Sequence, residues 1–391
     1  MQVPVLHSFP TWLHQTQTWM YTQVKYLPAP VVPHIVCHRT ANLEQFNMPH
    51  IHALANEPKW RWYWEKGLRK FGVRNYISLL TRVARQERAG IIHSHFGPYG
   101  WEDMEAAKKV GAQHVVTFYG ADVNKLPKQD PRWLDRYSRL FEHVSLVLCE
   151  GPHMGKCVEK LGCPGDKIRV QHLGIELDKH AFAPRTWQPG KPLRVLIASS
   201  FREKKGIPYG IKALAKLKAR VPIEVTVIGD AGKEATSQAE KKKILDAIAN
   251  NGLDNDIKLL GYQSYDRLIE EARQHHVYLA PSVTASDGDT EGGAPVSIIE
   301  MMASGMPVVS TYHCDIPHII THQKTGLLAE ERDVDGLFAG LLWLVENPAH
   351  WDTLTQAARA KIEEAYDARV QGERLAALYQ AVLATTLSVA V

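Results

Sequence analysis

The feature that most constrains the fold is a pattern that occurs twice along the chain. Short apolar runs rich in β-branched residues alternate with longer segments that have one polar face. In the first half the runs are VPVLHS, PHIVCH, IIHSHF, HVVTFY, VSLVLCE and IRVQHL. In the second half they are LRVLIASS, IEVTVIGD, IKLLGY, VYLAPS, PVVSTY and GLLAE. Strands that alternate with helices favour βα units and parallel sheets, so we predict two doubly wound α/β domains in tandem.

Proline and glycine mark the boundary between the two predicted domains. The segment PRTWQPGKP, residues 184–192, has three prolines and one glycine, which break helices and strands. A chain of 391 residues is also too long for one ordinary core. We therefore predict a first domain over 1–187, a second over 188–366, and a helix over 367–391 that packs back on the first domain. Ligands of such sheets bind at the carboxyl ends of the strands, and the expected site is a central cleft that both domains face.

Composition narrows the class of protein. The formal net charge of +4 is too small to indicate nucleic-acid binding by itself. Five scattered cysteines without C-x-x-C spacing predict neither a disulfide framework nor a zinc site, which favours a reducing cytoplasm. The N-terminal stretch lacks the pattern of a secretory signal. No apolar run reaches the ~18 residues that a membrane-spanning helix needs.

The strongest candidate site follows the run VYLAPS. There the turn VTASDGDTEGGAP leads into VSIIEMMA, and Pro295 suits the first helical position, where its missing N–H costs nothing. Gly292 and Gly293 let a ligand approach the backbone closely. The N-terminus of the following helix would bind phosphate. Glu300, about one and a half turns into that helix, would accept hydrogen bonds from ribose hydroxyls. The alternative is a plain loop with a surface glutamate.

Two other segments also follow predicted strands. In SFREKKG, the cations Arg202, Lys204 and Lys205 could clamp a diphosphate, and a solvated basic loop is the alternative. In VVTFYGADV, a buried strand delivers Tyr119 and Asp122 to the edge of the first sheet. Asp122 could cap the next helix instead of contacting a substrate.

Taken together, these motifs resemble the retaining glycosyltransferases of family 4, which have the GT-B fold of two Rossmann-like domains. PSVTASDGDTEGGAPVSIIEMMASGMPVVS is similar to the donor-site pattern of that family, and REKKG is similar to its phosphate loop. IIHSHFG and TFYGADV resemble its first-domain strands. The DGDxEG…P variant is similar to transferases of bacterial exopolysaccharide pathways, such as those for colanic acid or amylovoran. The resemblance covers nearly the whole chain.

The resemblance implies a role for each matching residue. Lys205 would bind the donor diphosphate, Glu300 would hold the ribose, and Glu291 would face the donor sugar. Tyr119 and Asp122 would approach the reacting sugar from the first domain. The backbone that lines the donor phosphates would be that of Gly292, Gly293, Ala294, Pro295 and Val296. Independently of the resemblance, Tyr262 follows the run IKLLGY and could stack on the nucleobase.

The chain departs from the family pattern in one spacing, three side chains and one loop. The family places its second acid eight positions after the first, whereas Glu291 and Glu300 are nine apart. Either the loop bulges by one residue, or Gly292 takes the place of the acid. Tyr119 stands where the family has a histidine, and His318 stands where it has the acid of GIPE. Ser200 stands where it has an arginine, and Arg202, two residues later, could reach the same phosphate. A glycine-rich loop after the first strand is absent.

The predicted function is retaining transfer of a hexose from a UDP- or GDP-sugar to a saccharide or lipid-linked acceptor. No cofactor or metal is expected, because the DGD of Asp287–Asp289 lies in a loop and two carboxylates do not make a metal site. We interpret that loop as solvated or as a sugar contact. The alternatives are a sugar-nucleotide epimerase, which would lack the EMMASGMPVVS pattern, and a non-catalytic sugar-nucleotide-binding subunit.

Two remaining features stay open at this point. The segment KWRWYWEKGLRKFG carries Trp60, Trp62 and Trp64 among basic residues, which suits an anionic membrane surface at the inner face of the plasma membrane. The alternative is a surface helix whose tryptophans pack on the first sheet. The histidines His93, His95 and His114 are expected to be structural, with His95 an additional candidate for acceptor contact.

Overall fold

The computed structural model describes residues 2–14, 17–73 and 75–389, which form two compact units. The first unit comprises Met1–Glu176 and Ala365–Val391, and the second comprises Leu177–Glu364. The predicted boundary at 187 therefore lies inside the second unit. The reason is packing: Trp187 is buried in the core of the second unit, and its indole N–H donates to the carbonyl of Lys191 at 3.0 Å.

The first unit contains a seven-stranded parallel sheet in the order β3-β2-β1-β4-β5-β6-β7. Its strands are β1 (Val3–Trp12), β2 (Val31–Thr40), β3 (Ile51–Ala53), β4 (Ile91–His95), β5 (Gln113–Phe118), β6 (Leu146–Cys149) and β7 (Ile168–Val170). Helices cover both faces, as buried parallel strands require. The six predicted runs all contain strands, whereas β3 was missed because three residues are too few to show a pattern.

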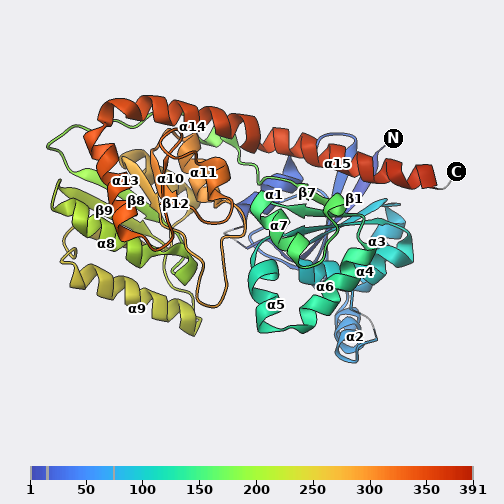
Figure 1. Ribbon diagram of the computed structural model, residues 1–391. Coiled ribbons are helices and arrows are strands. Elements are labelled where there is room, and N and C mark those ends of the chain that lie inside the picture. The colour runs from blue at the N-terminus through green and yellow to red at the C-terminus, as the bar shows by residue number, and fades with distance from the viewer. Residues whose placement is uncertain (1, 15–16, 74, 390–391) are drawn as a thin grey trace. The chain divides into compact units, whose positions relative to one another are not determined.

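The helices of the first unit are α1 (Thr18–Lys25), α2 (Lys59–Lys70), α3 (Ser78–Gln86), α4 (Gly97–Val110), α5 (Leu126–Gln129), α6 (Arg132–His143), α7 (Pro152–Lys160) and α15 (Ala368–Val389). Single turns lie at Leu54–Asn56, Ala121–Lys125 and Gly165–Lys167. One face of the sheet packs against Leu375, Ala376 and Tyr379 of α15. The opposite face packs against α3, α4, α6 and α7. The C-terminal helix thus completes the layer over the first sheet (Figure 1).

The second unit contains a six-stranded parallel sheet in the order β10-β9-β8-β11-β12-β13. Its strands are β8 (Leu193–Ala198), β9 (Ile223–Ile228), β10 (Ile257–Gly261), β11 (Val277–Ala280), β12 (Val308–Thr311) and β13 (Leu327–Ala329). Each coincides with one of the six predicted runs. In both sheets the order in which strands are added reverses between the first strand of the unit and its fourth, which lie side by side. Such a reversal creates the crevice where ligands of doubly wound sheets bind.

The helices of the second unit are α8 (Ile207–Lys218), α9 (Ala235–Asn250), α10 (Tyr265–Gln274), α11 (Val296–Ala303), α12 (Ile316–Ile319), α13 (Val334–Glu346) and α14 (Trp351–Tyr366). Single turns lie at Leu177–Lys179, Glu203–Lys205 and Pro348–His350. Helices α8, α9 and α13 pack on one face of the sheet. On the other face the hydroxyl of Tyr278 in β11 lies 2.9 Å from Ser297 Oγ, which ties α11 to the sheet.

Candidate active site

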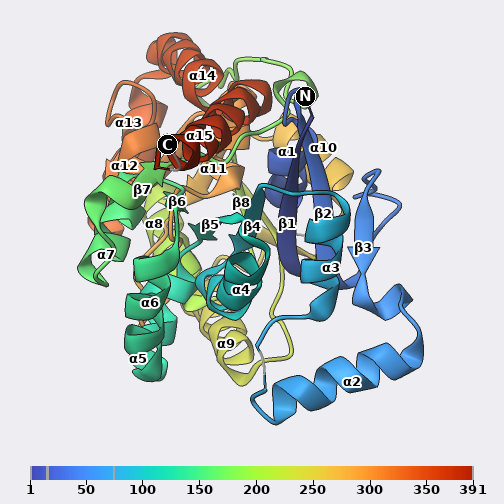
Figure 2. The ribbon, with the colours of Figure 1, turned by 90° about the vertical axis from the view of Figure 1, so that its right-hand side faces the viewer.

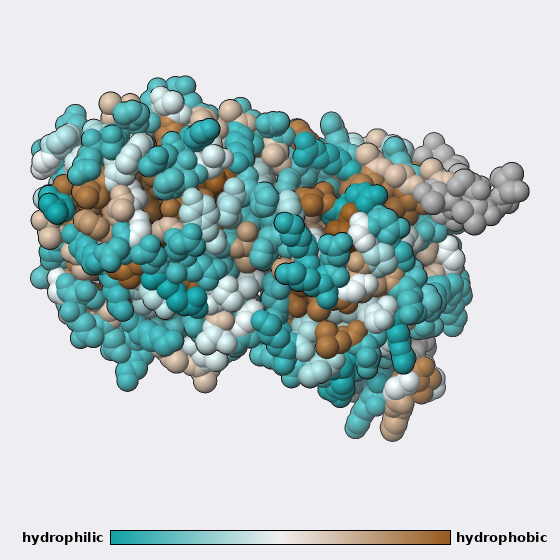
Figure 3. Space-filling view, viewed as in Figure 1, coloured by the Kyte–Doolittle hydropathy of each residue, from teal (hydrophilic) through white to brown (hydrophobic). Residues whose placement is uncertain are grey.

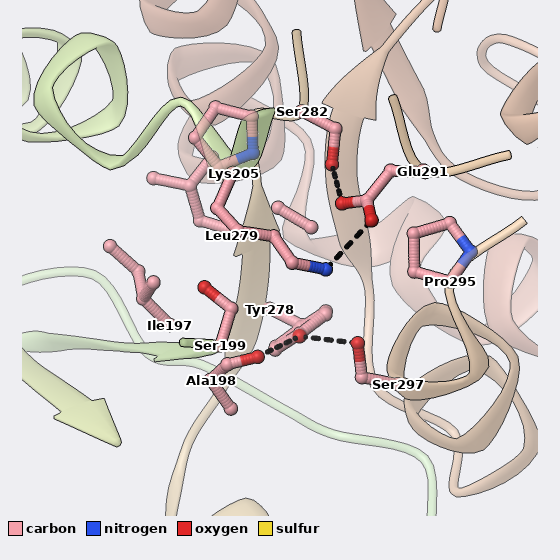
Figure 4. Close-up of a pocket in the computed structure, with 12 residues that line it drawn as sticks. Ile197, Ala198, Ser199, Lys205, Tyr278, Leu279, Ser282, Glu291, Pro295 and Ser297 are labelled. Carbon is pink, nitrogen blue, oxygen red and sulfur yellow. Dashed lines mark hydrogen bonds and ion pairs between the residues drawn. The ribbon is translucent and has the colours of Figure 1, made fainter. Parts of the chain in front are cut away.

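A pocket lies at the carboxyl ends of β8 and β11 in the second unit (Figure 4). It is a shallow depression that is partly open to solvent. The start of α11 forms one wall, through Pro295 and Ser297, so the positive end of that helix dipole borders the pocket. Its charged residues, Lys205 and Glu291, come from the two segments that the sequence singled out.

Lys205 and Glu291 form an ion pair inside this pocket. Lys205 Nζ lies 2.8 Å from Glu291 Oε2, and the two side chains are 20% and 5% exposed. Burial alone would raise the pKa of Glu291, but the ammonium groups of Lys205 and Lys204 outweigh it and lower that pKa to about 2. The carboxylate is therefore charged at neutral pH. The pocket holds one cation whose present partner is a carboxylate, which is the type of group a diphosphate could replace.

The other two cations of the basic loop are also paired with acids. Arg202 bonds to Asp289, and Lys204 Nζ lies 3.3 Å from the other carboxylate oxygen of Asp289. Lys204 also donates to the carbonyl of Thr290 at 2.7 Å. The prediction of a solvated DGD loop is wrong for Asp289, which is 3% exposed because these two cations cover it. Asp287 is exposed, and its carboxylate accepts from the Asp289 backbone.

Further polar groups, which the sequence did not reveal, hold Glu291 in place. Ser282 Oγ donates to Glu291 Oε1 at 2.8 Å, and the Glu291 backbone N–H donates to His313 Nε2 at 3.1 Å. The other ring nitrogen of His313 bonds to Glu331. Burial opposes ionisation of Glu331, but the bond to His313 and a bond from the Thr284 backbone lower its pKa to about 2. These partners come from three separate segments, so no local motif joins them.

The double glycine lies in the turn between the two acids. Gly292 has φ 84°, a left-handed conformation that favours glycine. Its N–H donates to Thr290 Oγ1 at 3.2 Å. Glu291 consequently points into the pocket, and Gly292 does not take its place there (Figure 4). Directly after Lys205, Gly206 has φ 62°, and a Cβ there would lie 1.8 Å from the carbonyl of Pro281, so only glycine lets α8 begin so close to β11.

Glu300 is buried on α11 and forms a small network with α10. Tyr265 Oη donates to Glu300 Oε1 at 3.0 Å and lies 3.0 Å from His180 Nε2. Burial raises the pKa of Glu300 to about 7, although the Tyr265 hydrogen bond and Lys179 lower it. Sequence analysis found Glu300 but missed Tyr265 and His180, which lie 35 and 120 positions away from it. The ribose-binding role of Glu300 stays a prediction.

The remaining predicted donor residues differ in how close they lie to the pocket. Gly292, Gly293 and Ala294 form the turn that joins Glu291 to Pro295, and Val296 begins α11. These four residues are neighbours of Glu291, Pro295 and Ser297, which line the pocket, but do not line it themselves. Tyr262 does not line it and is 57% exposed after β10, at the edge of the sheet. Its exposed ring is accessible to a nucleobase, and stacking there stays a prediction.

Asp122 belongs to the first unit, and its carboxylate has a structural use. One oxygen accepts from the Gly97 backbone at 2.9 Å, and the other accepts from the Tyr119 backbone at 3.0 Å. Asp122 thus binds the first residue of α4, not the helix that follows it in sequence. Burial raises the pKa of Asp122, while these backbone bonds lower it.

Tyr119 lies at the end of β5 and is 8% exposed. Its hydroxyl lies 2.6 Å from His95 Nδ1 and donates to Gln23 at 3.4 Å. Burial, followed by the nearby Glu150 carboxylate, raises the pKa of Tyr119 well above its ordinary value. The phenol therefore stays protonated at neutral pH.

His95 belongs to a buried group of histidines on the α15 side of the first sheet. Nitrogens of His7, His93 and His95 lie within 4.8 Å of one another. His93 already bonds through both nitrogens, to Tyr379 and Thr117 at 2.6 Å each, and its ring stacks on that of His95. Metal bonds lie in the plane of an imidazole ring, so stacked rings do not converge on one ion. Burial lowers the pKa of all three, and they form a neutral hydrogen-bonded network.

Two Rossmann-like units, one of which carries a pocket lined by Lys205, Glu291 and the start of a helix at its strand ends, are the architecture of the GT-B fold. Family comparisons agree. Residues 16–179 match the family described as "Glycosyltransferase Family 4", and residues 179–361 match "Glycosyl transferases group 1". The chain is 34% identical to the amylovoran biosynthesis glycosyltransferase AmsK of Erwinia amylovora, over 80% of this chain and 76% of that protein. The chain belongs to glycosyltransferase family 4.

Other known proteins are similar in sequence or in fold. The putative colanic acid biosynthesis glycosyltransferase WcaL of Escherichia coli is 29% identical over 80% of this chain and 77% of that protein. The fold is similar to that of sucrose-phosphate synthase from Thermosynechococcus elongatus, with a TM-score of 0.76 and 17% identity over 98% and 100% of the two chains. Anabaena HepE in complex with UDP and glucose has a TM-score of 0.76 at 16% identity, over 97% and 100%.

Proposed function

We propose that this glycosyltransferase moves a hexose from a UDP- or GDP-sugar to a saccharide or lipid-linked acceptor, with retention of anomeric configuration. The ion pair between Lys205 and Glu291 beside the start of α11 is the observation that carries the proposal. A nucleotide sugar needs a stabilised diphosphate leaving group above all. A cation and a helix N-terminus in one partly enclosed pocket supply that stabilisation.

Each residue of the site would contribute to one step. Lys205 would exchange its bond to Glu291 for a donor phosphate oxygen, and the amides at the start of α11 would bind the same diphosphate. Glu300 would accept hydrogen bonds from the ribose hydroxyls. Glu291, released from Lys205, would contact the donor sugar. Charge that develops on the leaving phosphate would then meet preorganised donors, which stabilises the transition state.

The proposed mechanism is attack from the front face, in which the leaving phosphate accepts the proton of the acceptor hydroxyl. The protonated state of Tyr119 and the backbone-bound carboxylate of Asp122 support a route without a protein base. We also propose that no metal or cofactor is needed, because Arg202, Lys204 and Lys205 already supply cationic charge at the diphosphate site.

The proposed setting is the synthesis of a polysaccharide or glycolipid on the cytoplasmic side of the plasma membrane. Relatives named for amylovoran and colanic acid biosynthesis support the product class. All five cysteines are free, which fits a reducing compartment. Among the described residues no helix is both long and apolar enough to cross a membrane.

A donor screen tests the proposal. Thermal shifts with UDP, GDP and ADP would identify the base, since a ligand at a hundredfold excess over its Kd stabilises the folded state by about 2.7 kcal/mol. Slow hydrolysis of the matching sugar nucleotide that EDTA does not affect would support the proposal. A transfer product with the same anomeric configuration as the donor would support retention. Nucleotide binding with no turnover would instead support a binding subunit. Release of the nucleotide together with an epimerised free sugar would support an epimerase.

A further inference from the structure

Helix α2 carries an exposed aromatic surface in the first unit. Trp60, Tyr63 and Trp64 are 63%, 66% and 63% exposed, and Phe71, directly after the helix, is 80% exposed. The tryptophans therefore do not pack on the first sheet, which excludes the alternative left open by the sequence. Figures 1 and 2 show α2 projecting from the rest of the first unit in both views.

Polar contacts, and not the aromatic rings, hold α2 to the unit. Glu65 is the buried residue of the helix, and it accepts hydrogen bonds from the backbone and hydroxyl of Ser78. Arg69 bonds to Glu102 at 2.7 Å. Arg61 bonds to Glu57 at 2.6 Å. Residues 61, 65 and 69 are four apart and share one face, so the opposite face is turned to solvent.

That outward face has two flanks. Tyr63 and Trp64 lie three and four positions after Trp60, and Phe71 lies seven after Trp64, spacings that place the four rings in one stripe. Lys59, Lys66 and Lys70 form the neighbouring stripe, and none of them makes an ion pair with a described residue. In Figure 3 the projecting region shows brown and teal residues side by side. We call these two stripes together the α2 face.

We propose that the α2 face binds the surface of an anionic lipid bilayer. Tryptophan and tyrosine have an apolar ring and a polar edge, and they favour the headgroup region of a bilayer. A stripe of unpaired lysines beside them complements anionic headgroups. The face carries no outward acid, since the glutamate of the helix is buried. This arrangement matches a helix that lies in the plane of the interface, and it would bring the enzyme to the membrane where a lipid-linked acceptor resides.

Flotation of the full chain with vesicles tests the proposal. Vesicles of phosphatidylcholine mixed with phosphatidylglycerol should carry the protein, and vesicles of phosphatidylcholine alone should carry at least about tenfold less. The variant Trp60→Ser/Tyr63→Ser/Trp64→Ser should lose binding about tenfold or more without a change in Tm, because its altered side chains are exposed. Hydrolysis of the donor in solution should also stay unchanged, so failure here is distinguishable from failure of the proposed reaction.

Replacing lysines of the α2 face by glutamates, with a matched control elsewhere, distinguishes attraction of this face to anionic lipid from a dependence on the net charge of the protein. Lys66→Glu/Lys70→Glu should abolish binding to the anionic vesicles, whereas Lys109→Glu/Lys160→Glu makes the same charge change at exposed positions of α4 and α7 and should keep it. Wild-type protein that does not float with anionic vesicles would overturn the proposal. Equal losses in both charge variants would overturn it, and so would undiminished binding by the aromatic variant. Concentration-dependent dimerisation that disappears in the aromatic variant, without vesicle binding, would assign the face to a second copy.

Discussion

The two sheets of this glycosyltransferase have the same parallel architecture but opposite chemistry at their carboxyl ends. At the first sheet, Tyr119 and His95 are neutral and Asp122 bonds to two backbone amides. At the second sheet, Lys205 and Glu291 face a pocket as charged partners. One fold therefore supports two kinds of edge: one at which Tyr119, His95 and Asp122 bond to neighbours within the unit, and one whose charged side chains, as we propose, exchange partners for a ligand. Substitutions should reduce stability at the first edge and ligand binding or turnover at the second.

The largest effect is expected for Lys205→Ala. Removing one preorganised donor from a developing anion costs about 3 to 4 kcal/mol of barrier, so turnover should fall by a factor of roughly 10² to 10³. Steady-state kinetics with the identified donor measures this. Lys212→Ala, at an exposed lysine of α8, is the matched control and should keep full activity. Undiminished turnover in Lys205→Ala would show that the diphosphate binds elsewhere.

Glu300→Gln should change both the pH dependence of stability and the affinity for the nucleotide, and in opposite directions. The pKa of Glu300 rises from 4.5 to about 7 in the folded protein, so the folded state binds its proton more tightly than the unfolded state does. The wild-type free energy of unfolding should therefore decrease, relative to that of the variant, as pH rises from about 4.5 to about 7. Above that range the variant should be more stable by on the order of 3 kcal/mol, because glutamine carries no buried charge.

Urea unfolding at about pH 5 and about pH 8 measures this difference, and Glu270→Gln on the exposed side of α10 is the control. Despite its greater stability, Glu300→Gln should bind the nucleotide more weakly, since hydrogen bonds to a charged acceptor are worth about 1.5 to 3 kcal/mol. Equal pH dependence in wild type and variant would contradict the assigned pKa. Unchanged nucleotide affinity would remove Glu300 from the ribose site.

At the first edge, Asp122→Asn should act mainly on stability. The amide would present donors where Gly97 and Tyr119 also donate, and leaving a buried N–H unpaired costs about 1 to 3 kcal/mol. Urea denaturation should show the loss, and Asp135→Asn, at an exposed position of α6, should show none. If Asp122→Asn lost turnover but kept normal stability, Asp122 would have a catalytic role. The contrast between a structural first edge and a ligand-binding second edge would then be wrong.

Most of the fold could be predicted from local sequence patterns. Strands that are buried on both faces read as apolar runs, so β8 and β11 were visible in the sequence, and the glycine-rich turn before Glu300 marked the start of α11. What could not be read locally were bonds between distant segments. The Asp122 bond to Gly97 spans 25 positions, and the Lys205 bond to Glu291 spans 86. Such pairs depend on which loops the sheet order brings together.

The α2 tryptophans show a second limit of sequence reading. A helical stripe of aromatic rings has the same spacing whether it packs on a sheet or faces solvent. Only the burial of Glu65 on the opposite face decided the orientation of α2. Likewise, the burial of Asp289 in the DGD loop follows from its contacts with Arg202 and Lys204, which spacing alone does not predict.

The central claim is that the nucleoside diphosphate binds where Lys205 now pairs with Glu291, and the Kd of UDP and GDP for Glu291→Gln tests it most directly. Glutamine keeps the acceptor for Ser282 but removes the negative charge that competes for Lys205. Titration calorimetry should show the preferred nucleotide binding several-fold more tightly to Glu291→Gln than to wild type, by roughly 1 kcal/mol, as expected when one nearby like charge is removed. Unchanged or weaker binding to that variant would contradict the assignment of this ion pair to the donor diphosphate.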